Sequence, residues 1–306
     1  MPRPIAVLLL VICTLLWGIA FVFQKAAMAH MGPLTFTAIR YIGGAVLLLP
    51  FAIPELRARR AAVGPLRLAP HQWWQLLALV LSFFAGVWLQ QAALQTATVT
   101  NGGFLTALYV IFTPLVGFAL FRARPHAIAY LGAPMALVGI YLLTGVSLGG
   151  FSFSDGLLVL GAVGWAIQIA VLAPLVKQTG LPVALSALTF LVTGLLALAG
   201  MPLLEHPTWE GISASWIEIL YTTVFSTSIA FTLQAIGQRY VPPANAAIIL
   251  SAESLFAAIA GAILLGERLP PLGYLGAGLI FVAILMVEAV PALAELRASA
   301  PASDRE

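Results

Sequence analysis

Glu253 is the one acidic residue that lies deep within a long apolar stretch of this sequence, which runs from about residue 243 to 265. If lipid surrounds that stretch, a charged carboxylate there costs roughly 2.5 to 3.5 kcal/mol on insertion scales, so something must compensate it. One interpretation is a site for a proton, or for the ammonium group of a small molecule, beside a wet cavity. The other is a structural carboxylate paired with Arg40, and the sequence leaves both open.

Arg40 lies about seven residues into the apolar stretch 33–54, which is roughly 10 Å along a helix. Its planar guanidinium suits a carboxylate held by two parallel hydrogen bonds, so Arg40 could bind an acidic group of a ligand. Structural pairing explains the same residue, as does a side chain that reaches outward to the membrane surface.

Two tryptophans occupy equivalent helix faces. Trp17 shares its face with Gln24, and Trp165 shares the corresponding face with Gln168. Aromatic rings attract ammonium groups and organic cations. Helix packing or a place at the lipid–water interface is the alternative, but both tryptophans lie well inside their segments, so we expect them to line a cavity.

The stretches 100–121 and 243–265 also match each other. Asn101 and Tyr109 share a face in the first, and Asn245 and Glu253 share the corresponding face in the second, so Tyr109 and Glu253 are equivalent positions. Both asparagines begin their stretches, where capping of a helix N-terminus is the simpler explanation.

Gln90 and Gln234 lie in apolar surroundings, where an amide needs hydrogen-bond partners. Bonding between helices and lining of a cavity both supply them. Together, the residues that we predict to bind a substrate are Trp17, Gln24, Arg40, Gln90, Asn101, Tyr109, Trp165, Gln168, Gln234, Asn245 and Glu253.

The composition excludes a water-soluble protein. Of 306 residues, 61% are hydrophobic and 8% are charged, whereas a soluble domain carries roughly 25% charged residues. Apolar stretches near membrane-spanning length fall at about 5–24, 33–54, 72–95, 100–121, 125–145, 154–176, 181–203, 213–237, 243–265 and 271–291. We therefore predict an all-α membrane protein with ten transmembrane helices.

The basic residues predict the orientation of these helices. If the helices alternate, most Lys and Arg fall on one side, including the cluster from Arg57 to Arg67, and the other side receives Lys25 and Arg268. The excess of positive charge marks the cytoplasmic side, so both termini are expected there, with the first helix retained. The stretch 55–71 is expected to be a loop. The net charge of +3 does not indicate nucleic-acid binding.

An internal repeat divides the chain in two. Leu89-Gln90 matches Leu233-Gln234, Asn101 matches Asn245, and Tyr130 to Ala133 matches Tyr274 to Ala277, all at one offset (245 − 101 = 144). We predict five-helix units at residues 5–146 and 154–291, followed by a disordered cytoplasmic tail at 292–306. Because five is odd, the second unit enters the membrane from the opposite face, which gives an inverted repeat typical of secondary transporters.

Short motifs resemble the EamA-type members of the drug/metabolite transporter superfamily. They are Leu16-Trp17-Gly18, Pro33 followed by Arg40, Thr113-Pro114-Leu115 and the run from Ser251 to Leu269. The resemblance covers about residues 5–290 and implies ten helices, a bacterial inner-membrane location and export of small metabolites, with amino acids the best-known substrates. The chain departs from the family pattern at Ser254, where proline is frequent.

The missing motifs narrow the function further. The sequence contains no HExxH, GxSxG, GxxxxGK[ST] or CxxC pattern, so we expect neither an enzyme nor a bound metal or cofactor. The function that we predict is export of amino acids or similar small molecules by alternating access at a central cavity in the lipid bilayer. Coupling to protons is left open. Efflux of drugs or organic cations is the first alternative, and a membrane scaffold or membrane enzyme is the second.

Overall fold

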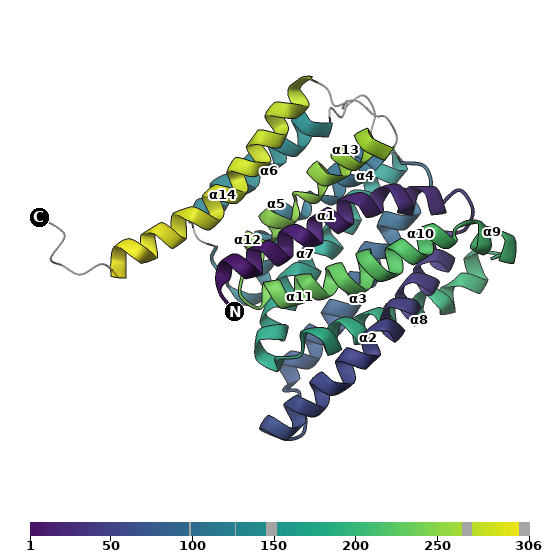
Figure 1. The fold of residues 1–306 in the computed structure, drawn as a ribbon, viewed down its shortest axis with the longest axis horizontal. Coiled ribbons are helices and arrows are strands. Elements are labelled where there is room, and N and C mark those ends of the chain that lie inside the picture. Colours follow the sequence, from purple (N-terminus) through teal and green to yellow (C-terminus); the bar gives the residue numbers. More distant parts are fainter. Residues whose placement is uncertain (98, 126, 145–151, 265–270, 300–306) are drawn as a thin grey trace, which may run out of the picture.

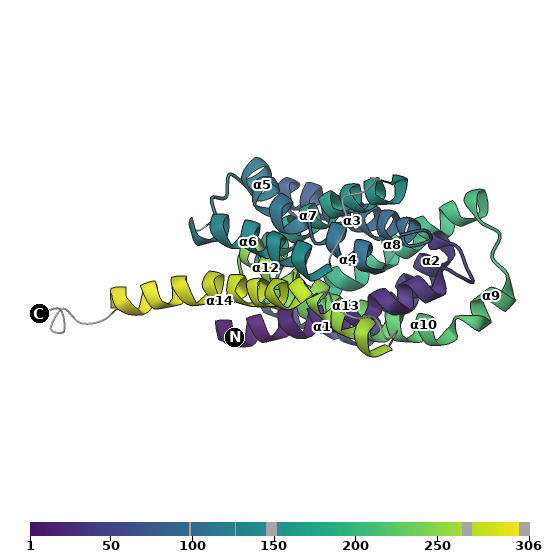
Figure 2. The ribbon, with the colours of Figure 1, turned by 90° about the horizontal axis from the view of Figure 1, so that it is seen from above.

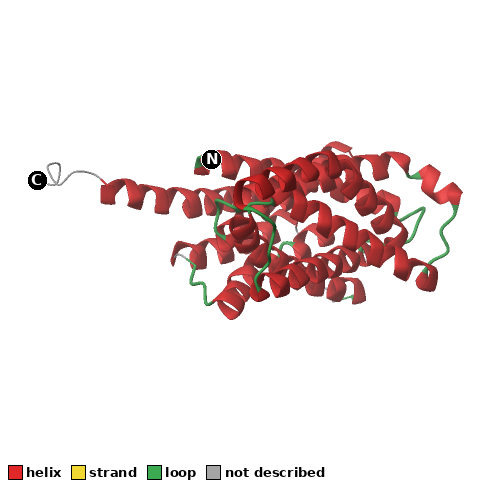
Figure 3. Cartoon of the chain, turned by 90° about the horizontal axis from the view of Figure 1, so that it is seen from below, coloured by secondary structure: helices red, strands yellow, loops and turns green. Residues whose placement is uncertain are grey.

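The computed structural model describes the chain except for residues 98, 126, 145–151, 265–270 and 300–306, and the side chains of 100, 101, 143, 144, 288, 289 and 291–299 are also not described. Every regular element in the described part is a helix (Figures 1 and 3). Eight helical spans are long and apolar enough to cross a membrane, and two shorter apolar helices accompany them.

The first half contains α1 (Arg3–Ala27), α2 (Pro33–Val63), α3 (Pro70–Ala93), α4 (Val99–Thr106), α5 (Tyr109–Phe121) and α6 (Ala127–Thr144). The second half contains α7 (Phe153–Thr179), α8 (Pro182–Leu204), α9 (Trp209–Ala214), α10 (Trp216–Tyr221), the π-helix η1 (Thr222–Phe231), α11 (Thr232–Gln238), α12 (Pro243–Leu250), α13 (Glu253–Leu264) and α14 (Pro271–Ser299). Several of these helices begin at proline, where the missing N–H costs no intrahelical hydrogen bond.

The helix contacts are related by the internal repeat: the main contacts between helices have counterparts between the equivalent helices of the other half. α2 lies on α8 and α6 lies on α14, so each of these pairs joins equivalent helices. α3 on α7 corresponds to α1 against η1 and α11, and α5 on α7 corresponds to α13 on α1. The central helices therefore surround one axis, while α6 and α14 form a pair at the edge (Figures 1 and 2). This arrangement confirms the predicted fold of two inverted five-helix repeats.

Two glutamates tie α2 and α8 together in a reciprocal way. Glu205, just after α8, accepts hydrogen bonds from the backbone N–H groups of Leu34 and Thr35 at the start of α2, at 2.6 and 2.8 Å. Glu55, near the end of α2, accepts one from Ala184 at the start of α8, at 2.8 Å. Each carboxylate thus caps the N-terminus of the other helix, where unpaired N–H groups and the helix dipole favour a negative charge.

Large aromatic residues mark both ends of the bundle. Trp73 and Trp74 are exposed at the start of α3, and Trp209 and Trp216 are exposed near the start of α9 and α10, at the opposite end. Tryptophan prefers the two interfaces of a membrane, whereas the exposed leucines and phenylalanines between them face the lipid chains.

Two boundaries differ from the sequence-based expectation. The stretch 55–71 was expected to be a loop, but α2 continues as a helix to Val63 and places Arg57, Arg59 and Arg60 on its last turns. The tail was expected to be disordered from residue 292, but α14 continues to Ser299 and runs beyond the bundle (Figure 2). Alanine, leucine, glutamate and arginine dominate both extensions, and these residues favour helix even outside an apolar environment.

Candidate functional site

A cavity lies at the centre of the bundle, between the two halves. Helices α1, α2, α3, α4, α5, α7, η1, α11 and α13 all contribute to its wall, and the centre of a water-sized sphere can move through about 40 Å³ of it. Such a volume holds roughly three water molecules. The cavity is therefore narrow in this conformation, and a larger molecule requires the surrounding helices to move apart.

The structure brings most of the predicted residues together at this cavity. Nine of the eleven line it: Trp17, Gln24, Arg40, Gln90, Tyr109, Trp165, Gln168, Gln234 and Glu253. They come from elements in both halves of the chain and include three pairs of equivalent positions of the repeat. Their function in binding a substrate remains a prediction.

The two predicted asparagines, Asn245 and Asn101, are not among the residues that line the cavity. The Asn245 side chain donates to the carbonyl oxygen of Val287 in α14 at 3.2 Å, so it links α12 to the peripheral helix pair and does not line the cavity. It therefore has neither the cavity position nor the N-cap position that the sequence suggested, because α12 begins at Pro243. Asn101 lies within α4, and its side chain is outside the described part of the structure.

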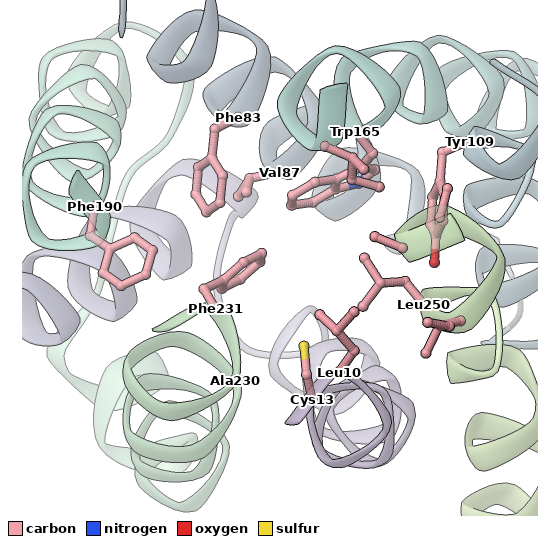
Figure 4. Packing of buried hydrophobic residues seen from close by; sticks show 14 of the residues in the cluster. Leu10, Cys13, Phe83, Val87, Tyr109, Trp165, Phe190, Ala230, Phe231 and Leu250 are labelled. Carbon is pink, nitrogen blue, oxygen red and sulfur yellow. The ribbon is translucent and has the colours of Figure 1, made fainter. Parts of the chain in front are cut away.

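Aromatic rings form one wall of the cavity. Phe231 lies between the two tryptophans, with ring centroids 4.5 Å from Trp17 and 5.8 Å from Trp165. The indole N–H of Trp17 donates to the carbonyl oxygen of Ser226 at 3.0 Å, and that of Trp165 donates to Oε1 of Gln90 at 2.9 Å. Figure 4 shows Trp165 and Phe231 side by side in this core. Both tryptophans therefore face the interior and not the lipid.

Gln168 and Gln234 pair through their amides. Nε2 of each donates to Oε1 of the other, at 3.3 and 3.2 Å, and both residues are buried. This reciprocal pair joins α7 to α11. It satisfies most of the hydrogen-bonding capacity of two polar groups that would otherwise be costly in an apolar interior.

Arg40 is buried and bonded to neutral side chains. Nε donates to Thr227 Oγ1 at 2.6 Å, Nη1 to Gln24 Oε1 at 3.0 Å and Nη2 to Ser226 Oγ at 2.8 Å. The guanidinium also lies 4.9 Å from the centroid of the Tyr41 ring. Because the side chain is 3% exposed, it does not reach outward to the membrane surface. A guanidinium has five N–H donors, so this arrangement fixes its position and leaves donors for a further acceptor.

Glu253, Tyr109 and Thr106 carry the unsatisfied polar atoms of the cavity. Oε1 of Glu253 and the hydroxyl oxygen of Tyr109 are buried without a well-formed hydrogen bond in the described structure, although the two side chains lie close enough to interact. The two residues line the same cavity and occupy equivalent positions of the repeat (253 − 109 = 144). Buried polar groups are normally hydrogen-bonded, so this pair is where water or a ligand would be expected to bind. Within the described residues, Glu253 forms no ion pair with Arg40.

Both residues follow a short interruption of the α-helical hydrogen-bonding pattern within their transmembrane spans. The fourth span is divided into α4 and α5 at Ala107 and Leu108, and the ninth into α12 and α13 at Ser251 and Ala252. Tyr109 begins α5, and Glu253 begins α13. At both points the backbone makes tighter bonds, from the N–H of Leu108 to Leu105 and from that of Ala252 to Ile249, and such a tight turn inside a helix often marks a functional site. From the sequence alone, both spans are predicted to be uninterrupted helices.

The π-helix η1 supplies the residues that sequence reasoning missed. Ser226 and Thr227 hold the Arg40 guanidinium, and Phe231 lies between the tryptophans. Tyr41 and Thr106, from α2 and α4, complete the wall. A π-helix turns more widely than an α-helix and commonly occurs at functional sites. The run of Ser and Thr from 222 to 228 was the available signal, because polar residues are rare within a membrane span.

The arrangement is suited to binding and not to bond chemistry. It combines one buried cation, one buried acid, four amides and an aromatic wall. Among the described residues, no group of three or more His, Cys, Asp or Glu could hold a metal ion.

Comparison with known proteins agrees with this architecture. A crystal structure of another protein matches with a TM-score of 0.76 at 18% identity, over 98% of this chain and 100% of that one. An "Uncharacterized transporter" of Archaeoglobus fulgidus is 28% identical over 91% of this chain and 84% of its own length. The "Uncharacterized transporter YwfM" of Bacillus subtilis is 29% identical over 93% and 94%, respectively.

One relative has a named substrate. The "Threonine/homoserine exporter RhtA" of Escherichia coli is 28% identical over 92% of this chain and 89% of its own length. The profile of the EamA-like transporter family matches residues 4–145 and again 152–289, once in each half of the fold. The chain is therefore a multi-pass membrane transporter, not an enzyme, and it belongs to the EamA-like transporter family.

Proposed function

We propose that this transporter exports small zwitterionic metabolites, amino acids in particular, from the cytoplasm by alternating access at the central cavity. The observation that carries the proposal is the presence of a buried cation, Arg40, and a buried acid, Glu253, on one cavity without an ion pair between them in the described structure. A buried charge is costly unless it is paired. A ligand with one carboxylate and one ammonium group would pair both.

The two ends of such a ligand find complementary groups. The carboxylate would accept the remaining N–H donors of Arg40, whose geometry Gln24, Ser226 and Thr227 fix in advance. The ammonium group would bind near Glu253 and Tyr109 and against the rings of the aromatic wall. The likeness to an exporter of threonine and homoserine supports this substrate class.

Efflux of organic cations is the second candidate. The tryptophans and Glu253 would suit a cation equally well. Arg40 opposes it, because a fixed guanidinium on the same small cavity repels a ligand that has positive charge and no carboxylate. We therefore place cation efflux behind amino-acid export.

Glu253 is the group that we propose to exchange a proton. Glu253 is buried and its Oε1 has no well-formed hydrogen bond in the described structure, so the neutral acid would leave no unpaired charge there. Protonation of Glu253 would remove the negative charge that we propose to hold the ammonium group of the substrate, and loss of the proton would restore it. Export would then draw on the proton gradient across the inner membrane, the location that a distant Escherichia coli relative, "Uncharacterized inner membrane transporter YedA", suggests.

Reconstitution tests the proposal directly. Purified protein in liposomes without ATP should accumulate labelled threonine or homoserine when a substrate gradient or a proton gradient is imposed. Arg40→Gln should abolish transport of amino acids, and Arg40→Lys should retain a small part, because lysine keeps the charge but cannot form two parallel bonds. Circular dichroism and gel filtration check that both variants fold. Uptake of organic cations but of no amino acid across a broad panel would contradict the proposal.

A further inference from the structure

A second cavity opens at the end of the bundle where α5, α7 and α11 end. The centre of a water-sized sphere can move through about 410 Å³ of it, ten times the corresponding volume of the central cavity. Its mouth is formed by the connection after α5, the last turn of α7 and the connection between α11 and α12. These three segments carry Arg124, Lys177 and Arg239, respectively.

This second cavity is aligned with the central one. Three helices line both: α5 contributes Tyr109 to the central cavity and Thr113 to the second, and α11 contributes Gln234 and then Gln238. Residues four apart lie about one helical turn, roughly 6 Å, from each other along the axis. On α7, Ile169 lines the central cavity and its neighbour Ala170 lines the second. The second cavity thus leads from the end of the bundle toward the central site.

Gly117 leaves open space at the wall of this second cavity. A side-chain carbon added to Gly117 would have no atom within 4 Å. The sequence pattern Thr113-xxx-Gly117 suggested a place where two helices approach each other closely. The structure shows that Gly117 keeps the cavity open instead, because its missing side chain leaves space that α5 would otherwise fill.

The charge at the mouth has one sign. Arg124, Lys177 and Arg239 line the cavity, and none of the described residues that line it is acidic. Glu55 attracts Arg239 from nearby, but its carboxylate already holds the N-terminus of α8. A concave surface with charges of one sign concentrates oppositely charged solutes.

We propose that this second cavity is a vestibule that gathers small carboxylate-bearing solutes from the cytoplasm and delivers them toward Arg40. The proposal rests on the proposed function for its direction of transport and its substrate class. Its charge and access can be measured without any transport. Positive charge on the cytoplasmic face also orients membrane proteins, so the test must separate vestibule cations from other cations of the same face.

Thiol labelling provides that measurement. Cys13, the single cysteine of the chain, is buried and is replaced by alanine as a background. Gly117→Cys then places a thiol in the open space of the vestibule, and Thr113→Cys provides a second position if the first variant does not fold. The full-length protein in phosphatidylcholine nanodiscs is treated with a negatively and a positively charged methanethiosulfonate of similar size. The anionic reagent should react about fivefold faster at physiological ionic strength, and high salt should remove the difference.

Two sets of substitutions distinguish the vestibule from the rest of the face. Arg124→Gln, Lys177→Gln and Arg239→Gln together should abolish the preference for the anionic reagent. The matched control removes three cations from the end of α2, which do not line the cavity, as Arg57→Gln, Arg59→Gln and Arg60→Gln. It should retain the preference. Equal labelling by both reagents, or an equal loss in both triple variants, would overturn the proposal.

An anionic lipid headgroup is the competing occupant. Nanodiscs that contain phosphatidylglycerol should label like those with phosphatidylcholine alone if the vestibule serves solutes. If phosphatidylglycerol blocks the anionic reagent, and the vestibule triple variant removes this block, the cavity binds lipid and the proposal is wrong. In liposomes, the vestibule triple variant should raise the KM for a transported amino acid severalfold with little change in kcat. If no amino acid is transported while the labelling preference persists, the proposed function fails and the vestibule remains.

Discussion

Arg40 and Glu253 share one cavity, yet the structure gives them separate surroundings. The donors of Arg40 bond to three neutral side chains, whereas Oε1 of Glu253 has no partner within the described residues. Within the described residues no ion pair joins them, which favours the interpretation in which the acid does not serve to neutralise the guanidinium. Neutralising Glu253 should therefore not strand a buried charge elsewhere in the protein.

The first prediction concerns Glu253→Gln. The amide keeps the volume of the acid and can still donate or accept a hydrogen bond, so expression and the thermal unfolding midpoint should remain close to those of the wild type. Transport should persist but lose its dependence on a pH gradient, because the amide cannot exchange a proton. Uptake into liposomes with and without an imposed pH gradient measures this. Poor folding rescued by adding Arg40→Gln would instead restore the ion-pair interpretation.

Residue types predicted most of the cavity wall, and local geometry explains the exceptions. Polar and aromatic residues inside apolar stretches are costly unless they face one another, so Trp17 and Gln234 could be assigned to the interior from the sequence alone. Thr106 could not, because a threonine hydroxyl can bond to its own helix and needs no cavity. Asn245 could not be placed for a different reason, since its partner in α14 lies 42 residues further along the chain.

At the scale of elements, glycines decide how closely helices approach. A side-chain carbon at Gly18 would lie 2.5 Å from Cβ of Phe256 and 2.6 Å from the backbone nitrogen of Ala257. α1 can therefore pack directly on α13 only without a side chain at position 18. The motif Leu16-Trp17-Gly18 thus has a physical reason: Gly18 allows α1 to approach α13 closely, and Trp17 lines the central cavity.

The second prediction compares two glycines. Gly18→Ala should destabilise the protein by about 1–3 kcal/mol, because overpacking forces α1 away from α13. Gly117→Ala, in the open space of the vestibule, should be close to neutral. Thermal unfolding in detergent measures both. Equal midpoints for the two variants would show that α1 and α13 do not pack as described.

The third prediction concerns the reciprocal caps of α2 and α8. Glu205→Ala and Glu55→Ala should each cost about 1 kcal/mol, since each leaves backbone N–H groups at a helix N-terminus without an acceptor. Glu205→Gln should cost less, because the amide oxygen still accepts. The same unfolding assay applies, with Glu210→Ala as control, an exposed acid at the same end of the bundle. A control variant as unstable as Glu205→Ala would contradict the capping role.

Helix types were predictable from the sequence, but their interruptions were not. The breaks before Tyr109 and Glu253 contain Ala107, Leu108, Ser251 and Ala252, none of which disfavours a helix strongly. The wide turns of η1 likewise depend on how Ser226 and Thr227 bond to Arg40, a contact between residues far apart in the chain. Such features are set by tertiary packing, which overrides local propensity.

For the whole molecule, the repeat carried the most information. An offset of 144 relates Gln90, Asn101 and Tyr109 to Gln234, Asn245 and Glu253, an offset of 148 relates Trp17 to Trp165, and an odd number of helices in each half requires an inverted arrangement. Exchanging the helices of one half for their equivalents in the other also relates the helix contacts of the structure. The cavity lining does not follow this symmetry: α2 contributes Arg40 and Tyr41, whereas none of the described lining residues comes from its equivalent, α8.

The fourth prediction concerns the orientation of the molecule in its membrane. Arg57, Arg59 and Arg60 end α2, and Arg124 follows α5 at the same end, whereas Glu205 and Glu210 lie at the other end. An excess of positive charge is retained in the cytoplasm, so the basic end should face inward and both termini with it. The vestibule would then open to the cytoplasm, as an exporter requires.

Single cysteines in the full-length Cys13→Ala protein test this orientation. Ala61→Cys, on the last turn of α2, and Ser213→Cys, in α9, are both exposed and lie at opposite ends of the bundle. In intact cells with a permeabilised outer membrane, a membrane-impermeant maleimide should label Ser213→Cys and leave Ala61→Cys unlabelled until the inner membrane is also opened. The Cys13→Ala protein alone should stay unlabelled throughout. Labelling of Ala61→Cys in intact cells would show that the molecule has the opposite orientation. The basic vestibule would then face outward, where it could receive solutes only for uptake.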